Sequence, residues 1–437
     1  MKRLNLYIIN KVIDNRLLTI DFFRPTIICC LLTVVFCLFT GCHDDLVPPD
    51  SPTPRAEAER TVIVYMAGDN SLGNTLSYNA IPLDTTEMVK GKDMIPGDVN
   101  FIVFVDDMQH TPAIYELSRS GGMQLWKRYE EELCTTDSLT MLNVLREIEY
   151  YFPARHYGIT FWSHASGWAP ERQSTRMKTF GKDETNPTGK LEMEIHVLHD
   201  VLAQLPRFDY IFFDACFMQC IEVAYELRDV TNYMVGSPAE IPGPGAPYDK
   251  LIGALCTSDV KGIVQGYCDK YPGTYDNFFY SGVLLSCIDC SKLEELAEAT
   301  GHFLTPFYMN RTEQSPSAHN FQAYCNDYKY YLTQFTYCFD MRTTMFNLLS
   351  EEDYTVWMEL YNEAVPLYLH SDPPNDYSLP SWYSIFCYPS YQKIQNPKCY
   401  GGVSMFVPLN VYNGYGWNQD FRKTSWYKAA GWDTTGW

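Results

Sequence analysis

Two short apolar stretches in the middle of the chain each lead into one chemically reactive side chain. Residues 157–162 lead into His164, and residues 210–213 lead through Asp214 to Cys216. Short runs rich in β-branched and aromatic residues, followed by a helical pattern, are typical of strands in a buried parallel sheet. The ligand site of such a sheet lies outside the carboxyl ends of its strands. We therefore expect His164 and Cys216 at that edge of a sheet.

The position of Cys216 also suggests its chemistry. The residues that follow it recur at helical spacing, so the sequence predicts a helix that begins at this cysteine. A helix N-terminus favours an anion and lowers the pKa of a thiol. A thiolate is the nucleophile that acyl transfer needs, and an imidazole on the neighbouring strand is suited to act as general base. We therefore predict Cys216 as the nucleophile and His164 as the base.

Strands alternate with helices around these two stretches. We expect strands over residues 61–66 and 99–105, and a helix capped by Asp137. Alternation with short connections is typical of a doubly wound α/β domain. A further strand over residues 281–288 and a last strand over 402–407 are expected in the C-terminal part, which we predict to complete the same sheet.

Four motifs follow one another along residues 60–410. They are the opening stretch 62–70, a Trp-x-His with Gly-Trp close behind over 162–168, Asp-Ala-Cys at 214–216 and the segment 237–245, with a looser match over 401–408. Together they resemble the clostripain family of cysteine peptidases. The resemblance implies a caspase-like three-layer sandwich, with a mostly parallel sheet flanked by helices and a C-terminal extension that completes the sheet. It also implies cleavage after basic P1 residues by a dyad of His164 and Cys216.

The residue after the histidine departs from the family pattern. The family usually has glycine there, whereas this chain has Ala165. If the backbone at this position must adopt φ > 0, an alanine costs on the order of 1 kcal/mol or more. The backbone amides of Ala165 and Cys216 remain the expected donors to an oxyanion.

Carboxylates near the carboxyl ends of the strands are candidates to bind a basic P1 side chain. Asp214 stands two residues before the nucleophile, and Glu240 and Asp249 are weaker candidates. A carboxylate complements a guanidinium or ammonium group. For Asp214 an equally favoured role is to cap the helix predicted at Cys216.

Residues 169–190 form a polar stretch without apolar periodicity. It carries several basic residues, including Arg176 and Lys178. The family resemblance implies a self-processing cleavage in this interval, for which Lys178 is our first choice. An ordinary surface loop with solvated basic side chains is an equally favoured interpretation.

The N-terminus has the pattern of an export signal. Basic residues precede an apolar run over residues 26–40, which leads to Gly41 and Cys42 and resembles a bacterial lipobox. We therefore expect a signal peptide over residues 1–41, a lipid on Cys42 and a Pro-rich tether over 42–58. The protein would be exported and lipid-anchored to the bacterial outer membrane, in the periplasm or at the cell surface. An uncleaved membrane anchor is the alternative.

The net charge of the chain and the spacing of its potential metal ligands limit the classes of binding partner that we expect. The formal net charge of −20 argues against nucleic acid. Protein or peptide substrates, and the membrane through the lipid, are the expected partners of a monomer. No cofactor or metal is expected, and calcium enters only by analogy with the family. His196, His199 and Asp200 have a spacing that a metal could use, but no second ligand cluster accompanies them.

We place a catalytic core at residues 59–260 and a C-terminal part, packed on it, at 261–437. The leading hypothesis is an exported cysteine endopeptidase. The alternative is a catalytically inactive caspase-like surface lipoprotein that binds a peptide or a glycan. A serine hydrolase that uses Ser163 or Ser166 is disfavoured because neither serine lies in a G-x-S-x-G motif.

Overall fold

The computed structural model describes residues 53–74, 80–168, 180–185, 191–276, 279–309, 324, 338–371 and 400–435. The expected signal peptide, Cys42 and Lys178 lie outside these residues. One compact unit begins at Pro54. Among the helices of the described residues, none combines the length and the apolar character that crossing a membrane requires.

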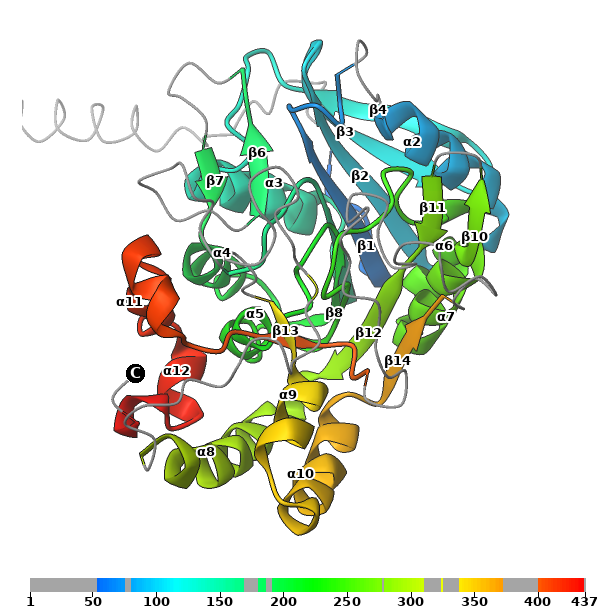
Figure 1. Ribbon diagram of the computed structural model, residues 1–437. Helices are drawn as coiled ribbons and strands as arrows, with labels where there is room; N and C mark the ends of the chain where they lie inside the picture. The colour runs from blue at the N-terminus through cyan, green and yellow to red at the C-terminus, as the bar shows by residue number, and fades with distance from the viewer. Residues whose placement is uncertain are drawn as a thin grey trace, which may run out of the picture. The chain divides into compact units, whose positions relative to one another are not determined.

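A nine-stranded sheet forms the centre of this unit, in the order β14-β12-β9-β8-β5-β1-β2-β3-β4 (Figure 1). The five strands from β9 to β2 are mutually parallel, and antiparallel neighbours lie at both ends. The mostly parallel sheet predicted from the sequence is therefore confirmed. The strands are β1 (Ala58–Gly68), β2 (Val99–Asp107), β3 (His110–Ser118), β4 (Gly122–Arg128), β5 (Ala154–Trp162), β8 (Phe208–Asp214), β9 (Thr231–Gly236), β12 (Leu284–Asp289) and β14 (Leu367–His370).

Helices cover both faces of the sheet and give the three layers that were predicted. Side chains alternate along each strand, so that Val62 and Val64 of β1 face one core while Ile63 and Tyr65 face the other. The sequence of a strand that is buried on both faces contains a continuous run of apolar residues, as that of β1 does. The first core is closed by α2 (Ala80–Gly91), α6 (Tyr248–Thr257) and α7 (Val260–Lys270), and the second by α3 (Ser138–Tyr151), α4 (Ile195–Leu202) and α5 (Ile221–Glu226).

The helix expected after Asp137 is confirmed together with its cap. The Asp137 carboxylate accepts hydrogen bonds from the backbone N–H groups of Leu139 and Thr140, each at 3.1 Å. These N–H groups have no partner inside the helix, and a short acidic side chain before the first turn satisfies them.

The C-terminal part completes the sheet, but not with the strand predicted over residues 402–407. β12 and β14 extend the sheet beyond β9. The prediction for 402–407 is wrong in length and partner, because only β15 (Ser404–Met405) forms and it pairs with β13 (Phe339–Asp340) in a separate two-stranded sheet. This short strand lies beside the segment after Cys216, where Ser404 N donates to Gln219 O at 3.0 Å.

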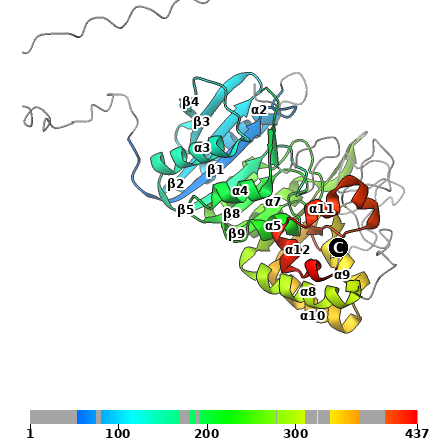
Figure 2. The same cartoon turned by 90° about the vertical axis from the view of Figure 1, so that its left-hand side faces the viewer.

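The remaining helices pack on the second core and on one another. α8 contacts α10 and α12, and α12 contacts α5 (Figure 2). Glu294 of α8 accepts from Tyr225 Oη at 2.6 Å and from Arg228 Nε at 2.7 Å, which ties α8 to the end of α5. The remaining helices are α8 (Leu293–Met309), α9 (Met341–Leu348), α10 (Glu351–Ala364), α11 (Trp417–Phe421) and α12 (Ser425–Ala429), with 3₁₀ turns at Lys92–Met94, Cys290–Lys292, Asn410–Tyr415 and Trp432–Thr434. The remaining strands are β6 (Phe180–Asp183), β7 (Leu191–Met193), β10 (Pro272–Asp276) and β11 (Phe279–Gly282).

Candidate active site

The strands that precede His164 and Cys216 are neighbours at the centre of the sheet. β5 and β8 run parallel, and their register places Trp162 opposite Asp214. His164 and Cys216 each follow two residues after that pair, so both leave the sheet at the same edge. The loops that carry them also touch, because a Cβ atom added to Gly167 would lie only 2.9 Å from the carbonyl oxygen of Phe217.

His164 is half-buried and contacts a serine from the turn that follows β1. Its Nε2 lies 2.8 Å from Ser71 Oγ. Burial lowers the pKa of His164, and the nearby Lys182 lowers it further. The imidazole is therefore neutral at neutral pH, which is the state a general base requires. Our sequence reasoning did not single out Ser71, although its place at the carboxyl end of the first strand was a signal.

The backbone at Ala165 is not strained. Gly181 N donates to His164 O at 3.0 Å, and Ala165 forms a bridge with Phe180. Among the described non-glycine residues, positive φ occurs only at Phe217 and Ser258, so Ala165 has an ordinary φ. The conformational cost considered for an alanine at this position therefore does not arise.

The helix predicted to begin at Cys216 begins instead at Ile221. The residues between them follow an irregular path, because Phe217 N donates to Ala239 O at 2.9 Å and Gln219 N donates to Ser237 O at 3.0 Å. These bonds hold the segment against residues 237–239 in a path that is not helical. Phe217, directly after the cysteine, has a left-handed φ of 62°.

The predicted lowering of the Cys216 pKa is also wrong. Burial, together with the nearby charge of Glu240, raises the pKa of the thiol to about 12. Ile241 N lies 3.4 Å from Sγ and opposes this rise by donating a hydrogen bond. Because α5 starts five residues beyond the cysteine, its N-terminus does not stabilise a thiolate here. Cys216 is a neutral thiol in this structure.

Asp214 does not cap a helix, which corrects that interpretation. It is buried, and its Oδ2 accepts from Ala246 N at 3.1 Å and from Tyr248 Oη at 3.0 Å, while Oδ1 accepts from Tyr267 Oη at 3.1 Å. Burial raises the pKa of this carboxyl group. Gly245 packs against it with φ 59°, and a Cβ there would lie 3.0 Å from Oδ2. Asp214 thus fixes the turn that precedes α6.

A second buried carboxyl group, that of Asp84 on α2, interacts with Asp214. Asp84 Oδ2 accepts from Trp162 Nε1 at 2.7 Å. Burial raises the pKa of Asp84 to about 9, and the charge of Asp214 contributes to the rise. Sequence reasoning missed Asp84, because a single acid within a helical stretch carries no local signal of burial.

The other acidic candidates occupy different places. Glu240 is half-buried and close enough to Cys216 for its charge to raise the thiol pKa. Asp249 lies in the first turn of α6, where its backbone is packed against Gly91 at the end of α2 and its side chain pairs with Lys250 at 3.4 Å. The structure thus brings Asp214 and Glu240 near Cys216, and it places Asp249 at the contact between two helices.

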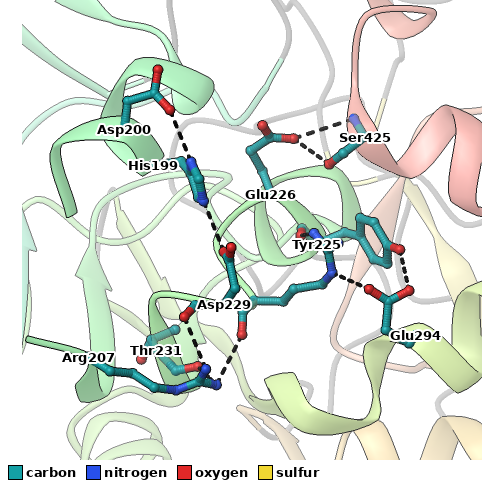
Figure 3. A network of polar contacts seen from close by, with 10 residues as sticks. His199, Asp200, Arg207, Tyr225, Glu226, Asp229, Thr231, Glu294 and Ser425 are labelled. Atoms are coloured by element: carbon teal, nitrogen blue, oxygen red, sulfur yellow. Dashed lines mark hydrogen bonds and ion pairs between the residues drawn. The ribbon is translucent and has the colours of Figure 1, made fainter. Parts of the chain in front are cut away.

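The histidines of α4 make ion-pair contacts. His199 Nε2 lies 2.9 Å from Asp229 Oδ1 and its Nδ1 lies 3.2 Å from Asp200 Oδ1 (Figure 3). His196 Nδ1 lies 3.3 Å from Glu194 Oε2. Within the described ranges, no group of three or more His, Cys, Asp or Glu side chains is arranged to hold a metal ion.

Comparisons with known proteins agree with this architecture. Residues 64–437 match the model of the clostripain family, peptidase family C11. A secreted C11 cysteine protease from Bacteroides thetaiotaomicron, solved in complex with an irreversible peptide inhibitor, is 28% identical with a TM-score of 0.70, over 86% of this chain and 99% of that chain. A search among curated proteins found no significant match.

Two further solved structures are similar in fold. An inactive zymogen C11 protease from Parabacteroides distasonis is 24% identical with a TM-score of 0.68, over 86% of this chain and 99% of that chain. The secreted C11 protease iotapain from Bacteroides thetaiotaomicron is 21% identical with a TM-score of 0.68, over 86% and 100%. With a family match over most of its length, the chain belongs to the clostripain family of cysteine peptidases.

Proposed function

We propose that the chain is an exported cysteine endopeptidase in which Cys216 is the nucleophile and His164 the general base. The register of β5 and β8 carries this proposal, since the two side chains follow the Trp162–Asp214 pair at equal distance. Contact between the Gly167 and Phe217 loops supports it. Burial disfavours both the thiolate and the imidazolium, so the resting pair is a neutral thiol and a neutral imidazole.

In the proposed reaction, His164 takes the proton of the thiol as sulfur attacks the scissile carbonyl carbon. The N–H groups of Ala165 and Cys216 have no hydrogen-bond partner among the described residues, and they would donate to the oxyanion. His164 then gives its proton to the leaving amine, which departs and leaves a thioester on Cys216. A water molecule, activated by the same imidazole, hydrolyses the thioester and regenerates the thiol.

We further propose that the enzyme cleaves after Arg or Lys at P1. Burial raises the pKa of both Asp84 and Asp214, and the charge of Asp214 contributes to the rise at Asp84. A cationic side chain that enters beside them would offset this rise and stabilise the carboxylate forms. The hydroxyl groups of Tyr248 and Tyr267 already hold Asp214 in place.

An activity probe tests these assignments. A peptide acyloxymethyl ketone with Lys or Arg at P1 should label the protein, and the labelling should be lost in Cys216→Ala and largely lost in His164→Ala. Cys134→Ala, which removes another partly buried free thiol, is the matched control and should label normally. Absence of labelling with any P1 residue, in cleaved and uncleaved protein alike, would support the inactive peptide- or glycan-binding lipoprotein instead.

Asp214→Asn tests the P1 preference separately. Removal of one charged acceptor should weaken labelling by the Arg and Lys probes roughly tenfold or more. Labelling by a probe with norleucine at P1, which has no charge to lose, should fall much less. Equal losses for both probes would contradict a role for Asp214 in charge recognition.

The anchor and the processing step belong to the same proposal. Export would remove residues 1–41, attach lipid to Cys42 and leave residues 42–58 as the tether. Cys42→Ser should then move the protein from the membrane fraction to the soluble fraction. Lys178→Gln should abolish a cut after residue 178 if the enzyme processes itself there, and Cys216→Ala should leave the chain intact.

A further inference from the structure

A cavity of ≈ 290 Å³ lies between α4, α5 and the α11–α12 segment. Neither His164 nor Cys216 lines it, so it is distinct from the proposed catalytic site. Trp168 forms part of its wall. The charged side chains in the lining are Glu194, His196, Glu222, Glu226, Asp420 and Lys423.

Glu222 is the most buried of these acids, with 1% of its surface exposed. Its Oε1 accepts from Phe406 N at 2.8 Å, whereas Oε2 has no hydrogen-bond partner in the part of the chain that the structure describes. Buried acceptors are normally satisfied. Burial raises the pKa of Glu222 to about 7. An unsatisfied carboxyl oxygen in the lining of a cavity therefore points to a cationic donor that enters from outside and stabilises the ionised form.

The other charges in the lining do not supply that donor. Lys423 pairs with Asp420 at 2.7 Å, and His196 pairs with Glu194 at 3.3 Å. Glu226 accepts from the backbone and hydroxyl of Ser425 (Figure 3). Among the described residues, Glu222 and Glu226 form no ion pair, so the cavity has an excess of negative charge.

Trp168 determines which kind of cation suits the cavity. Its indole is buried and packs against Phe406 and Phe421, with ring centroids 5.0 and 5.7 Å away. An aromatic wall beside carboxylates suits an organic cation, which gains cation–π attraction as well as charge-assisted hydrogen bonds. The acids of the lining do not form a group that could hold a metal ion among the described residues.

We propose that this cavity binds the guanidinium or ammonium group of an arginine or lysine side chain of a peptide, at a site separate from the catalytic one. Glu222 and Glu226 accept hydrogen bonds from the cation, and Trp168 packs beside its aliphatic stem. Binding here requires neither a reactive Cys216 nor a charged Asp214, so it can be tested independently of the proposed peptidase activity.

Calorimetric titration of the full chain carrying Cys216→Ala tests the site. Nα-acetyl-arginine amide should bind, and Nα-acetyl-citrulline amide, its neutral isostere, should bind at least tenfold more weakly. Glu222→Gln and Glu226→Gln should each weaken arginine binding roughly tenfold or more. Asp200→Asn, which changes an exposed carboxylate of α4 outside the cavity, should leave Kd within twofold. If the buried Glu222→Gln variant does not fold, Glu226→Gln carries the test.

Four results would overturn the inference. Equal affinity for the arginine and citrulline amides would show that the cavity does not recognise the positive charge of the ligand. Arginine binding that is lost in Asp214→Asn but kept in both glutamine variants would belong to the proposed P1 site. Calcium binding that Glu222→Gln abolishes, without arginine binding, would make the cavity a metal site. Spermidine binding tighter than the arginine amide would assign the cavity to free polyamines and exclude a peptide ligand.

Discussion

The hydroxyl of Ser71 lies 2.8 Å from Nε2 of His164, so one ring nitrogen of the proposed base is already engaged by the turn that follows β1. If Nε2 carries the proton and donates to Ser71, then Nδ1 is the nitrogen left to accept the proton of the thiol. The strand next to β5 thereby orients the imidazole.

Removal of this hydroxyl should reduce turnover. Ser71→Ala frees the ring to rotate and to adopt the other tautomer, so kcat/KM for a basic-P1 peptide should fall about tenfold. Ser71→Thr keeps a hydroxyl at the same position and should retain most of the activity. Steady-state kinetics on the three proteins provide the measurement, and equal rates for all three would show that the contact does not orient the base.

The charge of Glu240 should slow the reaction of Cys216 with small alkylating agents. Since the thiolate is the reactive form and the thiol pKa is raised, alkylation by iodoacetamide should accelerate with each step from pH 7 to pH 10. Glu240→Gln lowers the pKa and should raise the rate at pH 8 by about threefold to tenfold, while Glu240→Asp should stay slow. Mass spectrometry of the Cys216 peptide follows the reaction, and a wild-type rate already level at pH 8 would contradict the raised pKa.

The left-handed backbone at Phe217 should reverse the usual ranking of alanine and glycine. At most positions alanine is the more stabilising residue, but at a φ of 62° glycine avoids the clash of a Cβ atom. Phe217→Gly should therefore unfold with a free energy about 1 kcal/mol higher than that of Phe217→Ala. Urea unfolding in the Cys216→Ala background measures the difference, and a more stable alanine variant would show that the turn relaxes.

Buried Asp106 should make the protein less stable as pH rises. Burial raises its pKa to about 9, whereas in the unfolded chain an aspartate titrates near pH ~4. Between these values the folded state keeps a proton that the unfolded state has lost. The contribution of the protonated Asp106 to the free energy of unfolding is therefore complete at low pH. As pH rises between these two values, it declines by at most about 1.4 kcal/mol per pH unit.

Asp106→Asn cannot titrate, so its free energy of unfolding should depend less steeply on pH between 5 and 8. Urea titrations of the Cys216→Ala chain with and without this change provide the comparison. Asp200→Asn, at an exposed position, is the control. Parallel pH profiles for the Asp106→Asn variant and its parent would show that Asp106 is ionised in the folded protein.

The sheet, and the edge at which His164 and Cys216 leave it, were predictable because the central strands contain short apolar runs. Val62 to Ala67 and Tyr210 to Phe213 are buried on both faces, as is typical of strands in a parallel sheet that helices cover on both sides. The cap at Asp137 was predictable for a similarly local reason.

The path of the chain after Cys216 was not predictable from local pattern. Ile221, Ala224 and Tyr225 do lie on a helix, but pairing with residues 237–239 delays its start. The burial of Asp84 and Asp214 and the contact of Ser71 with His164 likewise depend on segments distant in the sequence. Rules based on residue spacing describe neighbours along the chain, whereas these interactions join residues that are close only in the folded structure.

The strand at Ser404–Met405 has a consequence for engineering. Ser404 N donates to Gln219 O, and Phe406 N donates to Glu222, so the segment that follows Cys216 is held in place by residues almost two hundred positions downstream. A chain truncated near residue 260 would retain His164 and Cys216 but would lose these two hydrogen bonds. Chimeras that exchange halves between related enzymes should therefore inherit the cysteine loop and the 404–406 segment from the same parent.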